Sequence, residues 1–344
     1  MSEVSVPTGA GRAATLRDVA RLAGVSSATA SKALNDRPDV RATTRQRVLD
    51  AARQLSFSPN AVARSLSAGR TGTVGLLTSD LDGRFSLPVL MGAEDALGVH
   101  ETSVFLCDAR GDAIREQHHI RALLSRQVDG LIVVGARPDS RPSLGQHLPV
   151  PVVYAYSPSE DPEDLSLVVD NTAGGRLAVD HLIRSGRTRI AHITGELGYG
   201  ASHDRVRGAS ERLAEAGLAL AGEQVWFGSW SEGWGRGATR MLLQRSPDVD
   251  AIFAGSDQIA RGVLDVLHEQ GRRVPEDVAV IGFDNWEAMA AESRPALTTV
   301  DMQLEVLGRR AAEHLAAAIA GRRERGTVEL VPRLVQRSST APVL

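Results

Sequence analysis

Residues 15–66 read TLRDVARLAGVSSATASKALNDRPDVRATTRQRVLDAARQLSFSPNAVARSL. The stretch opens with Thr15, a good N-cap residue, and apolar side chains at helical spacing follow it as far as Gly24, where a left-handed residue can end a helix. Ser26 is another good N-cap residue, and the pattern after it predicts a short helix over residues 27–35. Two short helices joined by a tight, glycine-containing turn are typical of a helix-turn-helix, whose second helix enters the major groove of DNA.

The sequence that follows extends this module. A third helix is predicted over residues 44–55, because its apolar positions share one face and can close a three-helix core. Residues 59–66 begin with Pro59, which suits the first position of a helix, but about two turns of isolated helix are only marginally stable in water. Residues 1–14 are mostly Ser, Thr, Gly, Pro and Ala with nothing to bury, and we expect a disordered tail.

Charge is distributed unevenly along the chain. The 344 residues carry a formal net charge of −3. Residues 15–70 contain about ten Lys/Arg against about four Asp/Glu, so roughly +6, and residues 1–14 balance at zero, which leaves about −9 for residues 71–344. A small basic module joined to a larger acidic one is typical of a DNA-binding protein with a separate regulatory part.

Three linked patterns extend beyond a general helix-turn-helix. They are T-L-x-D-V-A-x-x-A-G-V-S-x-x-T-x-S-x-x-L-N, then V-x-x-x-T-R-x-x-V, then L-x-F-x-P-N-x-x-A-R-x-L. On these residues the head resembles the DNA-binding head of the LacI/GalR (lactose repressor) family of bacterial transcription regulators. The resemblance covers the whole of residues 15–66 and continues into the rest of the chain.

The resemblance implies roles for individual residues of the head. Those expected to read bases are Ser27, Ala28 and Lys32. Those expected to contact the DNA backbone are Thr15, Ser26, Thr29, Ser31 and Asn35. Ala28 can offer only a methyl contact, most naturally to a thymine methyl group, and Lys32 is the only lysine of the chain, at a position where the family commonly has arginine. Local helix capping is the alternative role for Thr29 and Ser31, and Arg41 stands where the family usually has a serine N-cap for the third helix.

The family also implies a hinge helix that forms on DNA and pairs with its twin from a second subunit. Leu66 would then wedge between base pairs in the minor groove, Ala63 would allow close approach of the two helices, and Asn60 lies in the same helix. An ordinary amphipathic linker helix is the alternative.

From residue 73 onward, short apolar runs alternate with helical stretches, which predicts parallel sheets flanked by helices. Runs such as TVGLLT and SVFLCD are interpreted as buried strands, and a second series of strands begins after Gly186. The expected fold is a small all-α helix-turn-helix head with a hinge helix, followed by a two-lobed α/β body that resembles periplasmic binding proteins. The expected boundaries are 1–14 for the tail, 15–58 for the head, 59–72 for the hinge helix and linker, 73–186 with 303–320 for lobe one, and 187–299 with 330–340 for lobe two, within a body of 73–344.

Ligands of such folds bind at the carboxyl ends of strands, between the lobes. On the family pattern and these strand ends, the candidate effector-binding residues are Phe85, Arg205, Trp230, Ser256, Asp257 and Asp284. An aspartate paired with an arginine suits vicinal hydroxyls, and a flat aromatic face suits a sugar ring. Asp82 and Arg84 add charge to a loop that normally lines the pocket. Trp234 is expected in the core or an interface, and Trp286 either in the pocket wall or on the outer surface.

The sequence thus predicts a transcriptional repressor whose binding to a pseudo-palindromic operator in double-stranded DNA is controlled by a small-molecule effector, taken to be a carbohydrate. The alternatives are a nucleoside, a phosphorylated metabolite or a protein corepressor as effector, or a sugar-binding receptor without a regulatory role. No catalytic motif, cofactor or metal is expected, and the single cysteine, Cys107, excludes an internal disulfide. With no signal-peptide pattern and no long apolar run, we expect a cytoplasmic homodimer that does not associate with a membrane.

Overall fold

The computed structural model describes residues 14–34, 37–57, 70–79, 84–99, 102–145 and 147–340, in two compact units, 1–71 and 72–344. The first unit contains the helices α1 (Leu16–Ala23), α2 (Ser27–Leu34) and α3 (Ala42–Gln54). Their core is built from small apolar side chains, with Val19, Ala30 and Val48 buried at its centre. Gly24 ends α1 in the left-handed conformation, as predicted.

The third helix begins earlier than its sequence suggested. It starts at Ala42 instead of residue 44, and Arg41 occupies the N-cap position without a side-chain hydrogen bond. Arginine has no acceptor for the free amide groups of the first turn, so packing of Val48, Ala51 and Ala52 against the other two helices stabilises α3.

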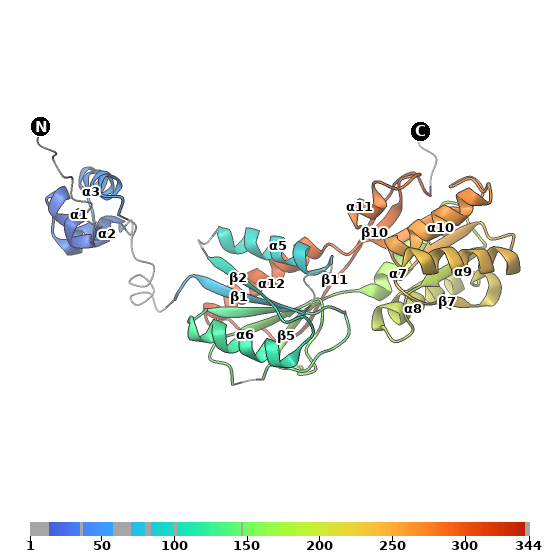
Figure 1. The fold of residues 1–344 in the computed structure, drawn as a ribbon, viewed down its shortest axis with the longest axis horizontal. Coiled ribbons are helices and arrows are strands. Elements are labelled where there is room, and N and C mark those ends of the chain that lie inside the picture. The colour runs from blue at the N-terminus through green and yellow to red at the C-terminus, as the bar shows by residue number, and fades with distance from the viewer. Residues whose placement is uncertain are drawn as a thin grey trace, which may run out of the picture. The chain divides into compact units, whose positions relative to one another are not determined.

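The second unit contains two six-stranded sheets, each of which forms one lobe. The first sheet has the order β11-β5-β4-β3-β1-β2, and all its neighbouring strands are parallel. Its strands are β1 (Thr73–Thr78), β2 (Ser103–Asp108), β3 (Gly130–Val134), β4 (Val152–Ala155), β5 (Leu165–Val169) and β11 (Gly326–Leu330). Helices α5 (Ser86–Gly98) and α12 (Leu304–Ile319) cover one face and α6 (Ala113–Ser125) covers the other (Figure 1).

The second sheet repeats this plan in the order β12-β10-β9-β8-β6-β7, in which β12 alone is antiparallel to its neighbour. Its strands are β6 (Ile190–Thr194), β7 (Val225–Phe227), β8 (Ala251–Ala254), β9 (Ala279–Asp284), β10 (Thr298–Asp301) and β12 (Arg333–Val335). One face carries α7 (Asn171–Arg184) and α8 (Gly200–Glu215), and the other carries α9 (Glu232–Arg245) and α10 (Asp257–Glu269). The short elements η1 (Ala221–Glu223) and α11 (Glu287–Ala290) lie in connections. The predicted two-lobed α/β body is therefore confirmed.

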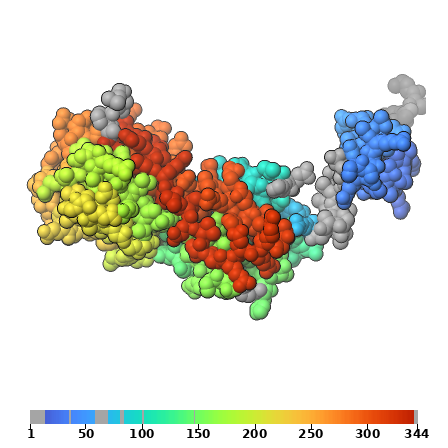
Figure 2. All heavy atoms as spheres, turned by 180° about the vertical axis from the view of Figure 1, so that it is seen from behind, coloured from blue at the N-terminus to red at the C-terminus, as the bar shows by residue number. Residues whose placement is uncertain are grey.

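The boundary between the lobes differs from the predicted one. Residues 171–186 were expected in lobe one, but α7 packs on α8 and on the second sheet, where Val179 and Leu182 join the core around Phe253. The last part of the chain also crosses between the lobes, since β11 completes the first sheet and β12 the second (Figure 2). Helical periodicity marks a helix but does not say which of two similar sheets will cover its apolar face.

Strand β2 is not buried as predicted. It forms the edge of the first sheet, with Phe105 and Leu106 exposed and Cys107 half-buried. An apolar run resembles a central strand whether or not a neighbour covers it, so only the strand order reveals the edge. No helix in the described part of the chain is long and apolar enough to cross a membrane.

Helices α7 and α8 approach closely at two glycines. A methyl group built on Gly208 would lie 1.9 Å from the carbonyl oxygen of Thr172, and one built on Gly175 would lie 2.1 Å from that of Arg205. Bare glycine surfaces therefore set the distance between the two helices. This contact also positions Arg205, which faces the space between the lobes.

Candidate functional site

Helix α2 presents the polar face that the sequence predicted. Ser27 and Ala28 are exposed at its start, whereas Ala30 and Ala33 are buried against the other helices. Lys32 is also exposed on α2, and it forms an ion pair with Asp39, with 2.5 Å between Nζ and Oδ2. The hydrogen bond from Lys32 lowers the pKa of the Asp39 carboxyl. Lys32 must leave this carboxylate before it can contact a base.

Several residues predicted to contact the DNA backbone make local hydrogen bonds in the head. Thr15 donates from its hydroxyl to Asp18 at 2.6 Å and from its amide at 3.0 Å. Ser26 accepts from the amide of Thr29 at 3.1 Å, and their hydroxyl oxygens are 2.9 Å apart. These contacts cap α1 and α2, the alternative considered for Thr29. Ser31 is half-buried, and the predicted positions Asn35, Asn60, Ala63 and Leu66 lie outside the described residues.

A cavity of about 300 Å³ lies between the two lobes, at the carboxyl ends of several strands. Its walls are formed by Arg84, Phe85, Ala136, Pro138, Tyr156, Tyr199, Ala201, Arg205, Trp230, Gln258, Asp284 and Trp286. Four of the predicted effector residues, at positions 85, 205, 230 and 284, therefore come together here. Five of the lining residues are aromatic in a chain with only 4% aromatic residues, so flat apolar surfaces are concentrated at this cavity.

Arg205 is held from several sides. It projects from α8 and is only 3% exposed. Its Nε donates to Oδ1 of Asn171 at 2.9 Å, and Nη1 donates to the backbone carbonyl of Gly255. The guanidinium carbon lies 3.6 Å from the centre of the Phe283 ring. Burial lowers the pKa of Arg205, and the charge of Asp284 opposes this shift.

Asp284 ends β9 and lies between two arginines. Its Oδ2 accepts a hydrogen bond from Arg84 at 2.5 Å, and its Oδ1 lies 3.7 Å from Nη1 of Arg205. Burial raises the pKa of this carboxyl, and both guanidinium groups act in the opposite direction. The backbone of Asp284 has a φ of 106°, which is unfavourable for a residue with a side chain and is typical of strain held at functional positions.

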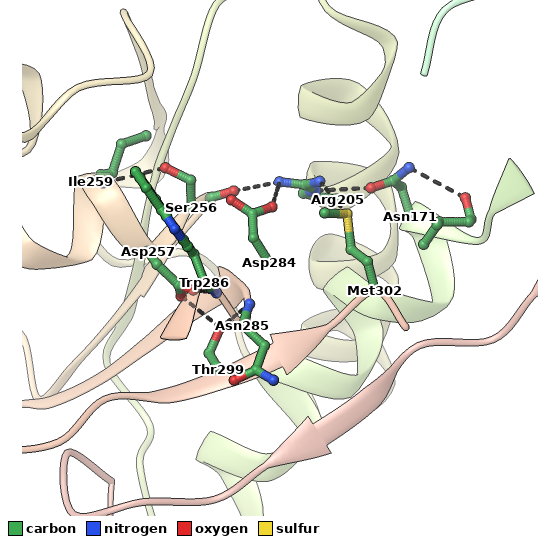
Figure 3. Close-up of polar contacts among 12 residues, drawn as sticks. Asn171, Arg205, Ser256, Asp257, Ile259, Asp284, Asn285, Trp286, Thr299 and Met302 are labelled. Carbon is green, nitrogen blue, oxygen red and sulfur yellow. Dashed lines mark hydrogen bonds and ion pairs between the residues drawn. The ribbon is translucent and has the colours of Figure 1, made fainter. Parts of the chain in front are cut away.

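Ser256 and Asp257 do not line this cavity, contrary to the prediction. Both are completely buried at the start of α10, where Ser256 caps the helix by accepting from the amide of Ile259. Asp257 accepts from the Thr299 hydroxyl at 2.6 Å and from the amide of Trp286 at 2.7 Å (Figure 3). Burial, followed by the nearby charge of Asp284, raises the pKa of Asp257 to about 8. The neighbouring Gln258 reaches the cavity instead.

The four tryptophans have different surroundings. Trp230 lines the cavity, as predicted, and its indole N–H is buried without a hydrogen-bond partner. Trp234, a residue of α9, is half-buried against the core of the second lobe and donates to the backbone carbonyl of Thr194, which fits the first of its expected positions, the core or an interface. Trp286 forms part of the cavity wall, which decides between its two expected positions, and Trp226 is buried in β7.

The sequence did not single out Tyr156, Tyr199 or Gln258 as cavity residues. Tyr156 follows the end of β4 and stacks on Phe85 with 5.0 Å between ring centres. Its position after a predicted strand was the one signal available, because strand ends line such clefts. Tyr199 precedes α8 and carries the guanidinium of Arg137 on its ring at 4.6 Å.

A second cavity of about 520 Å³ shares Arg84, Phe85, Asp284 and Trp286 with the first and extends toward the start of α12. It is more strongly charged, because Asp301, bound by Arg333 at 2.9 Å, also lies in its wall. Within the described residues, no cluster of His, Cys, Asp and Glu could hold a metal ion.

Comparisons with known proteins agree with this architecture. The family model for "Bacterial regulatory proteins, lacI family" matches residues 15–60, and the model for a "Periplasmic binding protein-like domain" matches residues 179–340. The chain is similar to the HTH-type transcriptional regulator CelR of Thermobifida fusca, with 38% identity over 317 residues that cover 90% of this chain and 93% of the relative. It is also similar to the HTH-type transcriptional repressor PurR of Aliivibrio salmonicida, with 31% identity over 329 residues, 95% of this chain and 98% of the relative.

Solved structures give the same result. A transcriptional regulator CelR–cellobiose complex matches with a TM-score of 0.64 and 32% identity, over 95% of this chain and 99% of that chain. A lac repressor dimer bound to operator and the anti-inducer ONPF matches with a TM-score of 0.75 and 26% identity, over 96% of this chain and 99% of that chain.

Proposed function

This chain belongs to the LacI family of bacterial regulatory proteins, and we propose that it is a DNA-binding transcriptional repressor controlled by a carbohydrate effector. The observation that carries the effector class is the cavity between the lobes. Aromatic side chains such as Phe85 and Trp230 offer apolar faces for a sugar ring, while Asp284 and Arg205 offer a carboxylate and a guanidinium for its hydroxyl groups. The similar CelR structure contains cellobiose, which supports the same class.

The cavity is of suitable size for this role. About 300 Å³ lies at the lower end of the range for small-molecule sites and is sufficient for a monosaccharide. The second cavity shares four lining residues with the first and could accommodate a further ring of a longer saccharide.

On the DNA side, Ser27, Ala28 and Lys32 read bases in the major groove in this proposal. The caps formed by Thr15, Ser26 and Thr29 keep α1 and α2 ordered before the protein binds, and their hydroxyl groups turn to phosphates, with Ser31 and Asn35, on the operator. The hinge residues Asn60, Ala63 and Leu66 form a helix on DNA, and Leu66 enters the minor groove.

We further propose that the active form is a homodimer on a pseudo-palindromic operator. The edge strand β2 exposes Phe105 and Leu106, and the adjoining helix α5 exposes Leu87 and Met91. A second copy would cover these side chains and protect the edge of the sheet from pairing with unrelated strands. The two-fold symmetry of the dimer then matches two half-sites in the DNA. Because bacterial operators are found in the cytoplasm, we propose that the protein acts there.

Effector binding influences the head by changing the arrangement of the two lobes. Arg84 from lobe one and Asp284 from lobe two form a direct ion pair across the cleft, so a ligand that engages either side chain changes how the lobes are held together. A bound ligand can shift DNA affinity only by its different affinities for the two lobe arrangements, with coupling of about 1–3 kcal/mol. The protein controls DNA occupancy by binding, and no enzymatic turnover is part of this function.

A thermal-shift screen of the full chain against sugars, nucleosides and phosphorylated metabolites tests the effector class. A ligand at 100 times its Kd stabilises the folded state by about 2.7 kcal/mol. Arg205→Ala and Trp230→Ala should abolish this stabilisation, while Arg207→Ala, an exposed arginine on the same helix, should retain it. A response to nucleosides with none to any sugar would overturn the carbohydrate class.

The same variants distinguish operator binding from the response to the effector. With an operator selected from random DNA, Arg205→Ala should bind as tightly as the wild type and no longer respond to the effector. An unchanged response of both Arg205→Ala and Trp230→Ala would remove the cavity from the proposal.

A further inference from the structure

The cavity between the lobes has an unequal charge balance. Its charged lining residues, within the described part of the chain, are Arg84, Arg205 and Asp284. Among the described lining residues, two guanidinium groups therefore share one carboxylate, and these three side chains are only 3–16% exposed. Buried charges are normally paired, because an uncompensated charge in a protein interior is costly.

Arg84 is held in position and still has an unused donor. Its guanidinium lies 4.7 Å from the centre of the Phe85 ring and 5.1 Å from that of Trp286. One Nη donates to Asp284, whereas Nε is buried and has no hydrogen-bond partner. A buried N–H group without a partner is destabilising, so the contact with Asp284 does not fully satisfy the Arg84 guanidinium group.

Arg205 is less well neutralised than Arg84. Its closest atom lies 3.7 Å from Asp284, beyond hydrogen-bonding distance. Nε donates to Asn171 and Nη1 to Gly255, while Nη2 lies 3.9 Å from the thioether sulfur of Met302, a weak acceptor. A buried guanidinium group that lines the cavity thus has no carboxylate within hydrogen-bonding distance among the described residues.

Among the described residues, three nearby aspartates do not compensate the second guanidinium group. Asp257 lies behind the cavity wall with both oxygens engaged, and its pKa of about 8 keeps it largely protonated at neutral pH. Asp301 is bound to Arg333. Asp139 accepts from the amide of Gly200 at 2.8 Å, and its loop also carries Arg137, whose charge is opposite. Glu287 and Glu305 are exposed and line the adjoining cavity, where Arg333 and Arg337 also lie in the wall.

We infer that the effector is an anionic carbohydrate, a sugar acid or a sugar phosphate, whose negative group lies between Arg84 and Arg205. This inference rests on the proposed function and specifies its ligand. The aromatic walls take the apolar faces of the sugar ring. The carboxylate or phosphate accepts hydrogen bonds from the guanidinium groups of Arg84 and Arg205, which both line the cavity, and thereby balances the second guanidinium charge.

Matched probes that differ only in charge test the inference. Isothermal titration of the full chain would use three series, built on glucose, galactose and cellobiose, each with the neutral sugar, a carboxylate derivative and a 6-phosphate. We expect an anionic member to bind at least about tenfold more tightly than its neutral parent, because hydrogen bonds to charged groups are the stronger ones. The carboxylate and phosphate arms identify which anion the site takes.

Variants at Arg84 link the preference to the structure. Arg84→Met keeps most of the volume between the two aromatic rings and removes the charge, and it should lower the ratio of anion affinity to neutral-sugar affinity at least about tenfold. Arg240→Met, which removes an exposed arginine paired with Glu269 on α9, is the matched control and should leave the preference intact.

Equal or tighter binding of every neutral sugar than of its anions would overturn the inference and leave carbohydrate sensing in place. An anion preference that persists unchanged in Arg84→Met would also overturn it. If neither the anionic sugars nor inorganic phosphate shift the melting temperature, the inference fails, and a simultaneous response to nucleosides would remove the carbohydrate proposal with it.

Discussion

Gly208 offers a sharp test of how the second lobe is packed. Replacing it with alanine adds one methyl group in the middle of α8, 1.9 Å from the carbonyl oxygen of Thr172 on α7. Ordinary van der Waals contact requires a separation of about 3.4–4 Å, so the two helix backbones must move apart. Neither partner is a flexible side-chain end that could move aside.

The cost can be estimated from this geometry. A radial gap of about 0.5–1 Å already forfeits a quarter to a half of the dispersion energy of each affected contact, and overpacking typically costs about 1–3 kcal/mol. Alanine is favoured over glycine in a helix by about 1 kcal/mol, which offsets part of this loss. Because the 1.9 Å contact is with backbone, the upper end of the overpacking range applies, and we expect Gly208→Ala to lower the free energy of unfolding by about 2 kcal/mol.

Gly237 is the matched control. It lies in the middle of α9 with helical backbone angles, and a methyl group built on it would have no atom within 4 Å. Gly237→Ala should therefore stabilise the protein by about 0.5–1 kcal/mol through helix propensity alone.

Thermal unfolding followed by circular dichroism measures both variants. A change of 1 kcal/mol moves the melting temperature of a domain of this size by about 2–4 °C. The melting temperature should fall in Gly208→Ala and rise in Gly237→Ala. If both variants become more stable, the close contact between α7 and α8 does not limit the packing, and the reasoning is refuted.

Two further predictions concern the hinge and a buried acid. Leu66→Ala should weaken operator binding far more than binding to random DNA, because only a formed hinge helix can insert its wedge; equal losses in a fluorescence anisotropy titration would contradict this. Asp257 keeps its proton up to about pH 8 when folded, whereas the unfolded chain releases it near pH 4, so this group makes the protein less stable as pH rises between these values. Asp257→Asn should remove that part of the pH dependence, and parallel melting-temperature curves for variant and wild type between pH 5 and 8 would argue against a protonated Asp257.

The predictions for the head depended on local interactions, which explains their accuracy. The capping residues Thr15 and Ser26 and the left-handed Gly24 act within a few residues of themselves, so their effects can be read from spacing. Arg41 shows the limit of this approach, since α3 begins at Ala42 without a side-chain cap because tertiary packing stabilises it.

The family pattern and the strand ends nominated Phe85, Arg205, Trp230 and Asp284, and the structure brings these four residues together around the cavity between the lobes. The same pattern also nominated Asp257, which the structure places behind the wall. A residue at the end of a strand or the start of a helix can face the cleft or the interior. Its orientation depends on the neighbouring strand, here on Thr299 of β10, which is distant in sequence.

The sequence by itself determined the helix-turn-helix head, the alternation of strands and helices, and the residue types available for a polar cleft. Tertiary structure alone decided that α7 belongs to the second lobe, that β2 is an exposed edge, and that Arg84 reaches Asp284 across 200 positions of sequence. Periodicity and capping are short-range properties, whereas the pairing of charges between lobes arises only when two sheets are brought together. The placement of Arg84 and Arg205 on either side of Asp284 likewise depends on the tertiary structure.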